Sequence, residues 1–115
     1  MSEPKEFTRY LKKVTDEDIT RLEELARENP TDLDILDWLA FALYSSGRYE
    51  RAVQVYEQCI SLEPDMASFH YFLGSSCYQM GAMDRAEAEW RRVMEMDHDG
   101  KFRSRASEKL KLLTR

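Results

Sequence analysis

The 115-residue sequence has few of the residues that interrupt helices or build reactive sites: four glycines, three prolines, two cysteines and two histidines. So few glycines and prolines favour long helices over many strands and turns. The cysteines form neither a Cys-x-x-Cys motif nor a Cys/His cluster, so we expect no disulfide framework and no zinc site. Cys59 and Cys77 lie within apolar helical patterns and are interpreted as small buried apolar residues.

Long apolar runs are also absent. No run approaches the roughly 20 residues that span a bilayer, and the charged N-terminus, MSEPKEFTRY, lacks the apolar segment of a signal peptide. We therefore expect a cytoplasmic protein without membrane insertion. The composition, 43% hydrophobic and 34% charged, excludes a disordered chain and suffices for the core of one domain.

The net charge of −5 is unevenly distributed along the chain. Residues 1–100 carry 11 basic and 21 acidic side chains, whereas residues 101–115 carry six basic and one acidic. An acidic body argues against nucleic acid as a partner. For the basic end two interpretations stay open: contact with an acidic partner, or a solvated helix face.

No residue pattern indicates catalysis. His70 and His98 do not lie beside a Cys, Ser or carboxylate at a catalytic or metal-ligand spacing. The sequence has no glycine-rich phosphate loop, and MDHDG at 96–100 is interpreted as a helix end rather than a metal site. We expect no enzymatic activity, no catalytic or metal-binding residue and no cofactor.

The sequence repeats itself at a 34-residue offset, which we call the repeat period. The segment LAFALYSSGRYERAVQVY, at 39–56, is matched by LGSSCYQMGAMDRAEAEW, at 73–90. Each copy is interrupted at a glycine, Gly47 or Gly81, which can adopt the left-handed conformation that ends a helix. On both sides of the interruption apolar residues recur at i, i+3, i+4 and i+7, which predicts two helices joined by a short turn. The apolar face of the first helix consists of Leu36, Leu39, Ala40 and Leu43.

These repeated residues resemble the tetratricopeptide repeat family, whose pattern is W-x2-L-G-x2-Y, then A-x3-F, then P over 34 residues. The first copy has Leu36, Leu39-Ala40, Leu43, Gly47, Tyr49, Ala52, Tyr56 and Pro64 at these positions. The second copy has His70, Leu73-Gly74, Cys77, Gly81, Met83, Ala86 and Trp90, and it departs from the pattern at His70, Cys77 and His98. The match extends from Leu33 to His98.

The resemblance implies an all-α fold, a right-handed stack of antiparallel helix hairpins in a single domain, with six or seven helices. We expect an N-terminal helix and a partial repeat at 1–32, with Thr15 as the N-cap of its second helix. Full repeats are expected at 33–66 and 67–100. The basic segment at 101–115 is expected to form a capping helix with a stripe of Phe102, Ala106, Leu110 and Leu113.

The first helix of each repeat also carries aromatic residues opposite its apolar face. A helix that is apolar on two sides must bury both or leave an exposed apolar surface. The family resemblance implies that this side lines a concave groove for peptides, and aromatic residues commonly anchor interfaces. The candidate partner-binding residues are Asp34, Asp37, Trp38, Phe41 and Tyr44 in the first repeat and Ser68, Tyr71, Phe72, Ser75 and Tyr78 in the second.

Three occupants of this groove stay open. One is a protein or peptide partner, for which Asp34 and Asp37 would favour a basic residue. Another is the chain's own N-terminal helix, through Phe7, Tyr10 and Leu11, and the third is a second copy, which would give a homodimer. Family members that clamp a C-terminal carboxylate use Lys, Arg and Asn on this face, where this sequence has aspartates and aromatics.

An interaction adaptor is therefore the leading functional hypothesis. The alternative is a small chaperone that shields a hydrophobic client. LAFALYSSGRYERAVQVY and FHYFLGSSCYQMG are similar to the tetratricopeptide chaperones of type III secretion, and this similarity motivates the alternative. A structural subunit of a larger complex is the third hypothesis.

Overall fold

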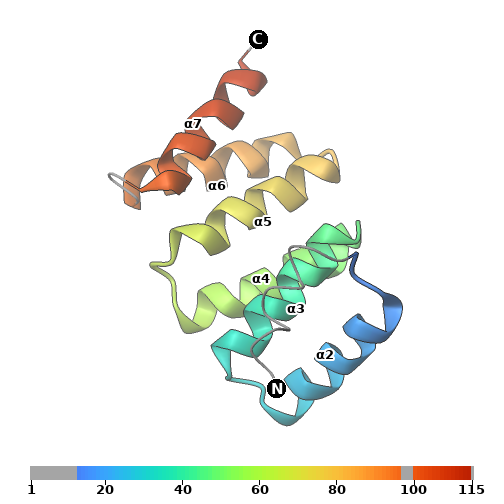
Figure 1. Cartoon of the computed structure of the whole chain (residues 1–115). Helices are drawn as coiled ribbons and strands as arrows, with labels where there is room; N and C mark the ends of the chain where they lie inside the picture. Colours follow the sequence, from blue (N-terminus) through green and yellow to red (C-terminus); the bar gives the residue numbers. More distant parts are fainter. Residues whose placement is uncertain (1–12, 97–99, 115) are drawn as a thin grey trace.

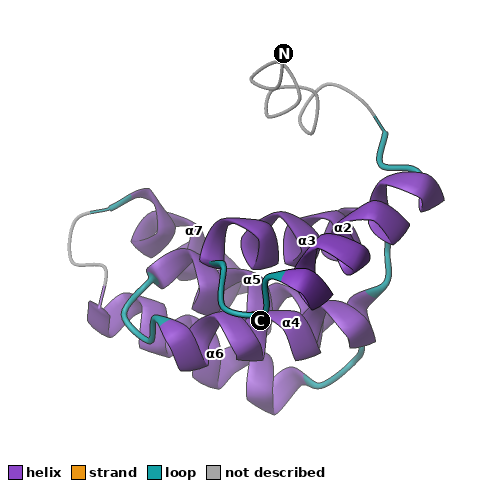
Figure 2. Cartoon of the chain, turned by 90° about the horizontal axis from the view of Figure 1, so that it is seen from below, coloured by secondary structure: helices purple, strands orange, loops and turns teal. Residues whose placement is uncertain are grey.

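The computed structural model describes residues 13–96 and 100–114, which form six helices and no strand (Figure 1). Within residues 13–96 short loops join consecutive helices, and each of the six helices packs against the next (Figure 2). The predicted all-α stack of helix hairpins is confirmed. The predicted N-terminal helix with Phe7, Tyr10 and Leu11 lies outside the described residues, as does His98. The helices are α2 Asp16–Glu28, α3 Leu33–Ser45, α4 Tyr49–Leu62, α5 Ala67–Gln79, α6 Met83–Met96 and α7 Lys101–Leu113.

The helix positions follow the repeat period. Helices α3, α5 and α7 have 13 residues each and begin at Leu33, Ala67 and Lys101, which are one repeat period apart. Helices α4 and α6 begin at Tyr49 and Met83, which are separated by the same period. Helix α7, which is predicted from the sequence as a cap, therefore occupies the position of the first helix of a further repeat.

The glycine turns end the first helix of each full repeat in the same way. Gly47 has φ 84° and Gly81 has φ 83°, the left-handed conformation in which a side chain is strained. Beyond each glycine, the next amide donates back to a carbonyl five residues earlier: Arg48 N to Leu43 O at 2.8 Å, and Ala82 N to Cys77 O at 2.9 Å. This geometry satisfies carbonyls at the helix end and reverses the chain. The predicted helix breaks are confirmed.

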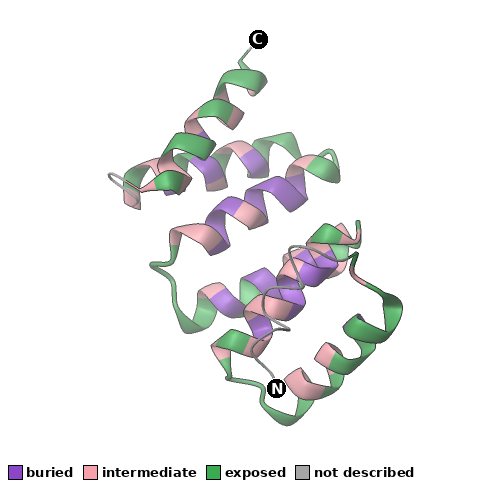
Figure 3. Cartoon of the chain, viewed as in Figure 1, coloured by how far each residue is buried: buried purple, intermediate pink, exposed green. Residues whose placement is uncertain are grey.

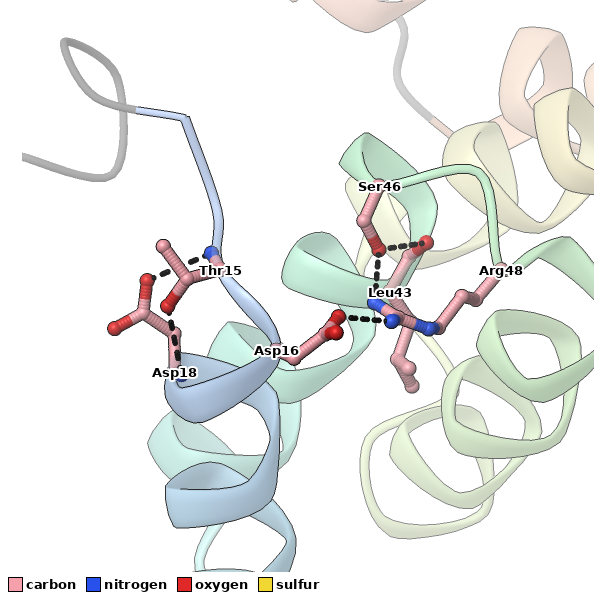
Figure 4. A network of polar contacts seen from close by, with 6 residues as sticks. All are labelled: Thr15, Asp16, Asp18, Leu43, Ser46 and Arg48. Atoms are coloured by element: carbon pink, nitrogen blue, oxygen red, sulfur yellow. Dashed lines mark hydrogen bonds and ion pairs between the residues drawn. The ribbon is translucent and has the colours of Figure 1, made fainter.

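Thr15 caps α2, as predicted, through a capping box (Figure 4). The Asp18 amide donates to the Thr15 hydroxyl at 3.1 Å, and the Thr15 amide donates to the Asp18 carboxylate at 3.0 Å. Asp16, next in the chain, accepts a hydrogen bond from Arg48 in the turn after α3. The start of α2 is therefore fixed both locally and against the first full repeat.

The core lies between neighbouring helices and is richest in α3 and α5 (Figure 3). The predicted apolar face of α3 is confirmed, since all four of its residues are at most 1% exposed. On α4 the core residues are Ala52, Val55, Tyr56 and Cys59. By contrast, α2 and α7 contribute one buried residue each, Ile19 and Ala106.

Two ion pairs join the second helices of successive repeats at equivalent positions. Arg51 of α4 contacts Glu23 of α2 at 2.8 Å, and Arg85 of α6 contacts Glu57 of α4. Each partner of the second pair lies one repeat period after its counterpart in the first. The stacking of the repeats is thus reproduced at the level of single side chains, although exposed pairs of this kind contribute little free energy individually.

Candidate functional site

The candidate residues lie on α3 and α5, and the structure gathers several of them around Phe72. The ring centroid of Phe72 is 5.5 Å from those of Phe41 and Tyr44 on α3. It is 5.2 Å from that of Tyr71, its neighbour on α5. These spacings are typical of edge-on and offset aromatic pairs, which add to the gain from burial. The aromatic residues of the two repeats therefore form one contact network.

Phe102 of α7 extends this network to a third helix. Its ring centroid lies 5.5 Å from that of Tyr71 and 6.0 Å from that of Phe72. From the sequence, Phe102 is predicted in the stripe of the capping helix and not in the site. The repeat period could have identified it, because residues 34, 68 and 102 are equivalent. We call the five residues Phe41, Tyr44, Tyr71, Phe72 and Phe102 the aromatic cluster.

Tyr71 and Ser75 are the two buried members of the candidate set. Both side chains are buried, with 7% and 4% exposed. The Tyr71 carbonyl oxygen accepts hydrogen bonds from the Trp90 indole N–H and from the Ser75 hydroxyl, each at 3.1 Å. The Tyr44 hydroxyl is hydrogen-bonded to the Ser75 side chain, and burial raises the pKa of Tyr44. Tyr71 and Ser75 thus hold α5 against its neighbours and present little surface to a partner.

The remaining candidates are at least partly accessible. Tyr78 lies with its ring centroid 5.8 Å from that of Trp90 on α6, so it belongs to the α5–α6 contact rather than to the aromatic cluster. Asp34 is exposed. The half-buried candidates are Asp37, Trp38, Phe41, Tyr44, Ser68, Phe72 and Tyr78.

These residues and their equivalents on α7 define what we call the α3–α5–α7 face. It consists of the positions of Asp34, Asp37, Trp38, Phe41 and Tyr44 together with the residues one and two repeat periods later. On α5 these are the five predicted residues Ser68, Tyr71, Phe72, Ser75 and Tyr78, and on α7 they are Phe102, Arg105, Ala106, Lys109 and Leu112.

The two cysteines are buried and reduced, as predicted. Burial raises the pKa of the Cys59 thiol to about 12, with the Asp37 carboxylate adding to the effect. Burial likewise raises the pKa of Cys77. Both thiols are therefore protonated near neutral pH, which does not suit a nucleophile or a metal ligand.

His70 also has a packing role. It is 4% exposed, and its ring nitrogens lie 2.8 Å from a Glu89 carboxylate oxygen and 2.9 Å from the Pro64 carbonyl oxygen. Residues 13–96 and 100–114 contain no group of three His, Cys, Asp or Glu side chains that could hold a metal ion. Over the same ranges, every helix is too short or too polar to cross a membrane.

Comparison with known proteins finds a matching family model and similar solved structures. The family model for the tetratricopeptide repeat matches residues 40–81. Among solved structures, that of MamA AMB-1 is similar with a TM-score of 0.70 and 25% sequence identity, over 72% of this chain and 49% of the MamA chain. The chain thus spans about half the length of the MamA chain. No curated protein matches the sequence.

Proposed function

Because the chain belongs to the tetratricopeptide repeat family, we propose that it is an interaction adaptor that binds a partner peptide on the α3–α5–α7 face. Arrays of this family are protein-interaction scaffolds whose stacked helices present an extended binding surface. The family and fold are typical of non-enzymatic proteins. The finer assignment, to this face and to a peptide, is our proposal.

One observation carries the proposal: the aromatic cluster is continuous across three helices and yet is not sealed. Phe72 contacts rings from α3 and α7, and it still retains partial exposure together with Phe41 and Trp38. Aromatic side chains that are fixed by their neighbours lose little conformational entropy when a partner covers them. Such residues are the usual anchors of interfaces.

The experiment that tests this proposal uses Trp38→Ala. Trp38 is half-buried on the face, whereas Tyr71 is a poor choice because its removal would disturb the contacts with Trp90 and Phe102. Random 12-residue peptides displayed on phage would be selected on the wild-type chain and then tested against the variant. We expect selected peptides to lose most of their binding to Trp38→Ala while its helical circular dichroism is unchanged.

The matched control is Met83→Ala, which removes a large apolar side chain that is 42% exposed at the start of α6 and lies off the face. It should leave peptide binding unchanged. If no selected peptide depends on Trp38, or if Met83→Ala weakens binding equally, the proposal is wrong and the aromatic cluster serves packing alone.

A further inference from the structure

Helix α7 adds a third row of side chains to the proposed binding face. Phe102, Arg105 and Lys109 lie one repeat period after Ser68, Tyr71 and Ser75 of α5. Direct contacts support this equivalence. Phe102 packs on Tyr71, and the Arg105 guanidinium carbon lies 5.3 Å from the centre of the Phe102 ring. The basic helix is therefore continuous with the aromatic cluster.

The three rows differ in charge. At the positions equivalent to Phe102, Arg105 and Lys109, helix α3 carries Asp34, Asp37 and Phe41. The equivalent residues of α5 are uncharged. Charge along the face therefore changes from acidic on α3, through a neutral aromatic centre, to basic on α7.

The charged ends are accessible. Asp34 and Arg105 are exposed and Lys109 is half-buried. Within residues 13–96 and 100–114, none of these three side chains forms an ion pair with another residue. Their charges are thus available to a partner, unlike that of Arg51, which the stack uses internally.

We propose that the face recognises a peptide segment of defined charge order, with a basic residue over α3, apolar residues over the aromatic cluster and an acidic residue over α7. This inference rests on the proposed function and adds the orientation of the partner. Exposed ion pairs add little affinity, but a peptide with the opposite order would bring like charges together at both ends. Aromatic contacts would supply most of the affinity, and the charges would determine the direction in which the peptide binds.

The basic segment at 101–115 thereby has a role in binding the partner. The rows from α3 and α5 carry no cation for a carboxylate, as predicted from the sequence. Arg105 and Lys109 supply two cations on α7, and the guanidinium can bind a carboxylate through two parallel hydrogen bonds. The acidic group would be a Glu or Asp side chain of the partner peptide.

The test compares peptides selected from the same phage-displayed 12-residue library on the wild-type chain and on Arg105→Glu/Lys109→Glu. Wild-type chain should enrich peptides with basic residues at one end and acidic residues at the other, on either side of an apolar centre. The variant should lose the preference for the acidic end. A peptide selected on the wild type should bind the variant about tenfold more weakly, because attraction becomes repulsion.

The matched control is Arg91→Glu/Lys111→Glu, which changes the net charge equally at exposed positions. Arg91 lies on α6, and Lys111 points about 200° away from Lys109 around α7. This control variant should bind the selected peptide with wild-type affinity. Equal weakening by both variants, or Trp38-dependent peptides without charge order, would overturn the inference and leave the proposed function intact. Absence of any Trp38-dependent peptide would overturn the proposed function itself.

Two other occupants would give distinct results, and either would overturn the inference. Enriched peptides that resemble residues 1–12 would assign the face to the chain's own N-terminus. A dimer in sedimentation velocity that Trp38→Ala dissociates would assign it to a second copy.

Discussion

The two full repeats share a backbone plan but fill it with different side chains. The first repeat has Ala40 and Tyr56 where the second has Gly74 and Trp90, one repeat period later in each case. All four are buried. A β-carbon on Gly74 would lie 2.8 Å from the Trp90 indole nitrogen, closer than real contacts allow. The larger ring of the second repeat is thus accommodated by the smaller residue that faces it.

A second pair differs in polarity rather than size. Leu36 and Val55 of the first repeat are replaced by His70 and Glu89 in the second, and the histidine–carboxylate contact is 2.8 Å. Both ring nitrogens of His70 face acceptors, a carboxylate and the Pro64 carbonyl, so the protonated imidazole satisfies both. The departure from the family pattern at His70 is therefore compensated by Glu89.

A large effect on stability is expected from Gly74→Ala. The added β-carbon collides with the Trp90 ring, and overpacking of this kind costs roughly 1–3 kcal/mol. Alanine has a higher helix propensity than glycine, and this gain of about 1 kcal/mol offsets part of the overpacking cost. Urea unfolding followed by circular dichroism would measure the net loss. Adding Trp90→Tyr, which recreates the Ala40/Tyr56 pair, should recover stability; a double variant less stable than Gly74→Ala would show that the two repeats are not interchangeable.

His70→Leu should lower the free energy of unfolding by about 1–3 kcal/mol, because Glu89 and the Pro64 carbonyl both lose a buried donor. The variant His70→Leu/Glu89→Val introduces the apolar pair of the first repeat and should be close to wild type, since apolar replacements of buried charge pairs are often neutral or stabilising. Equal stability of the single and double variants would contradict the pairing.

The same pair predicts a pH dependence. The hydrogen bond to Glu89, aided by the Pro64 carbonyl and opposed by burial, raises the pKa of His70 above its ordinary value of 6.5. A raised pKa in the folded state stabilises the protein below the unfolded value, and this contribution is lost as the pH rises through the folded value. Unfolding at pH 6 should therefore require more urea than at alkaline pH, and His70→Leu should remove this difference. A dependence of opposite sign, or one that persists in His70→Leu, would contradict the assignment.

The smallest effects concern the ion pairs that the repeats share. Arg51→Ala and Arg85→Ala should each lower the free energy of unfolding by less than about 1 kcal/mol, because the pairs are substantially exposed. Arg51→Ala should be the more costly, since Glu23 is less exposed than Glu57. Thermal unfolding at low and high salt would measure both, and a larger loss for Arg85→Ala would contradict this ranking.

Much of this organisation could be predicted from the sequence because it is local. The repeat period, the glycine breaks and the Thr15 cap depend on residues that lie close together in the chain. The apolar face of α3 follows from helical spacing alone.

The features that could not be predicted from the sequence are contacts between different helices, which depend on how the helices pack. A helical wheel places Tyr71 on the aromatic side of α5, but its burial follows from contact with Trp90 and Phe102 of two other helices. Helix α7 lacks most residues of the family pattern, so only the repeat period, and not the pattern itself, indicates its place in the repeat register. The His70–Glu89 pair joins residues 19 apart, and spacing alone does not indicate it.

Binding at the α3–α5–α7 face can be tested directly by mapping a selected peptide on the chain by NMR, with the 115-residue protein labelled with ¹⁵N. If the α3–α5–α7 face is the binding site, amide shifts should concentrate in α3, α5 and α7 and around the Trp38 indole, with α2 and α4 nearly unchanged. Shifts centred on α2, α4 and α6 would contradict binding at this face, because the peptide would then bind the side on which the repeats are joined by their ion pairs.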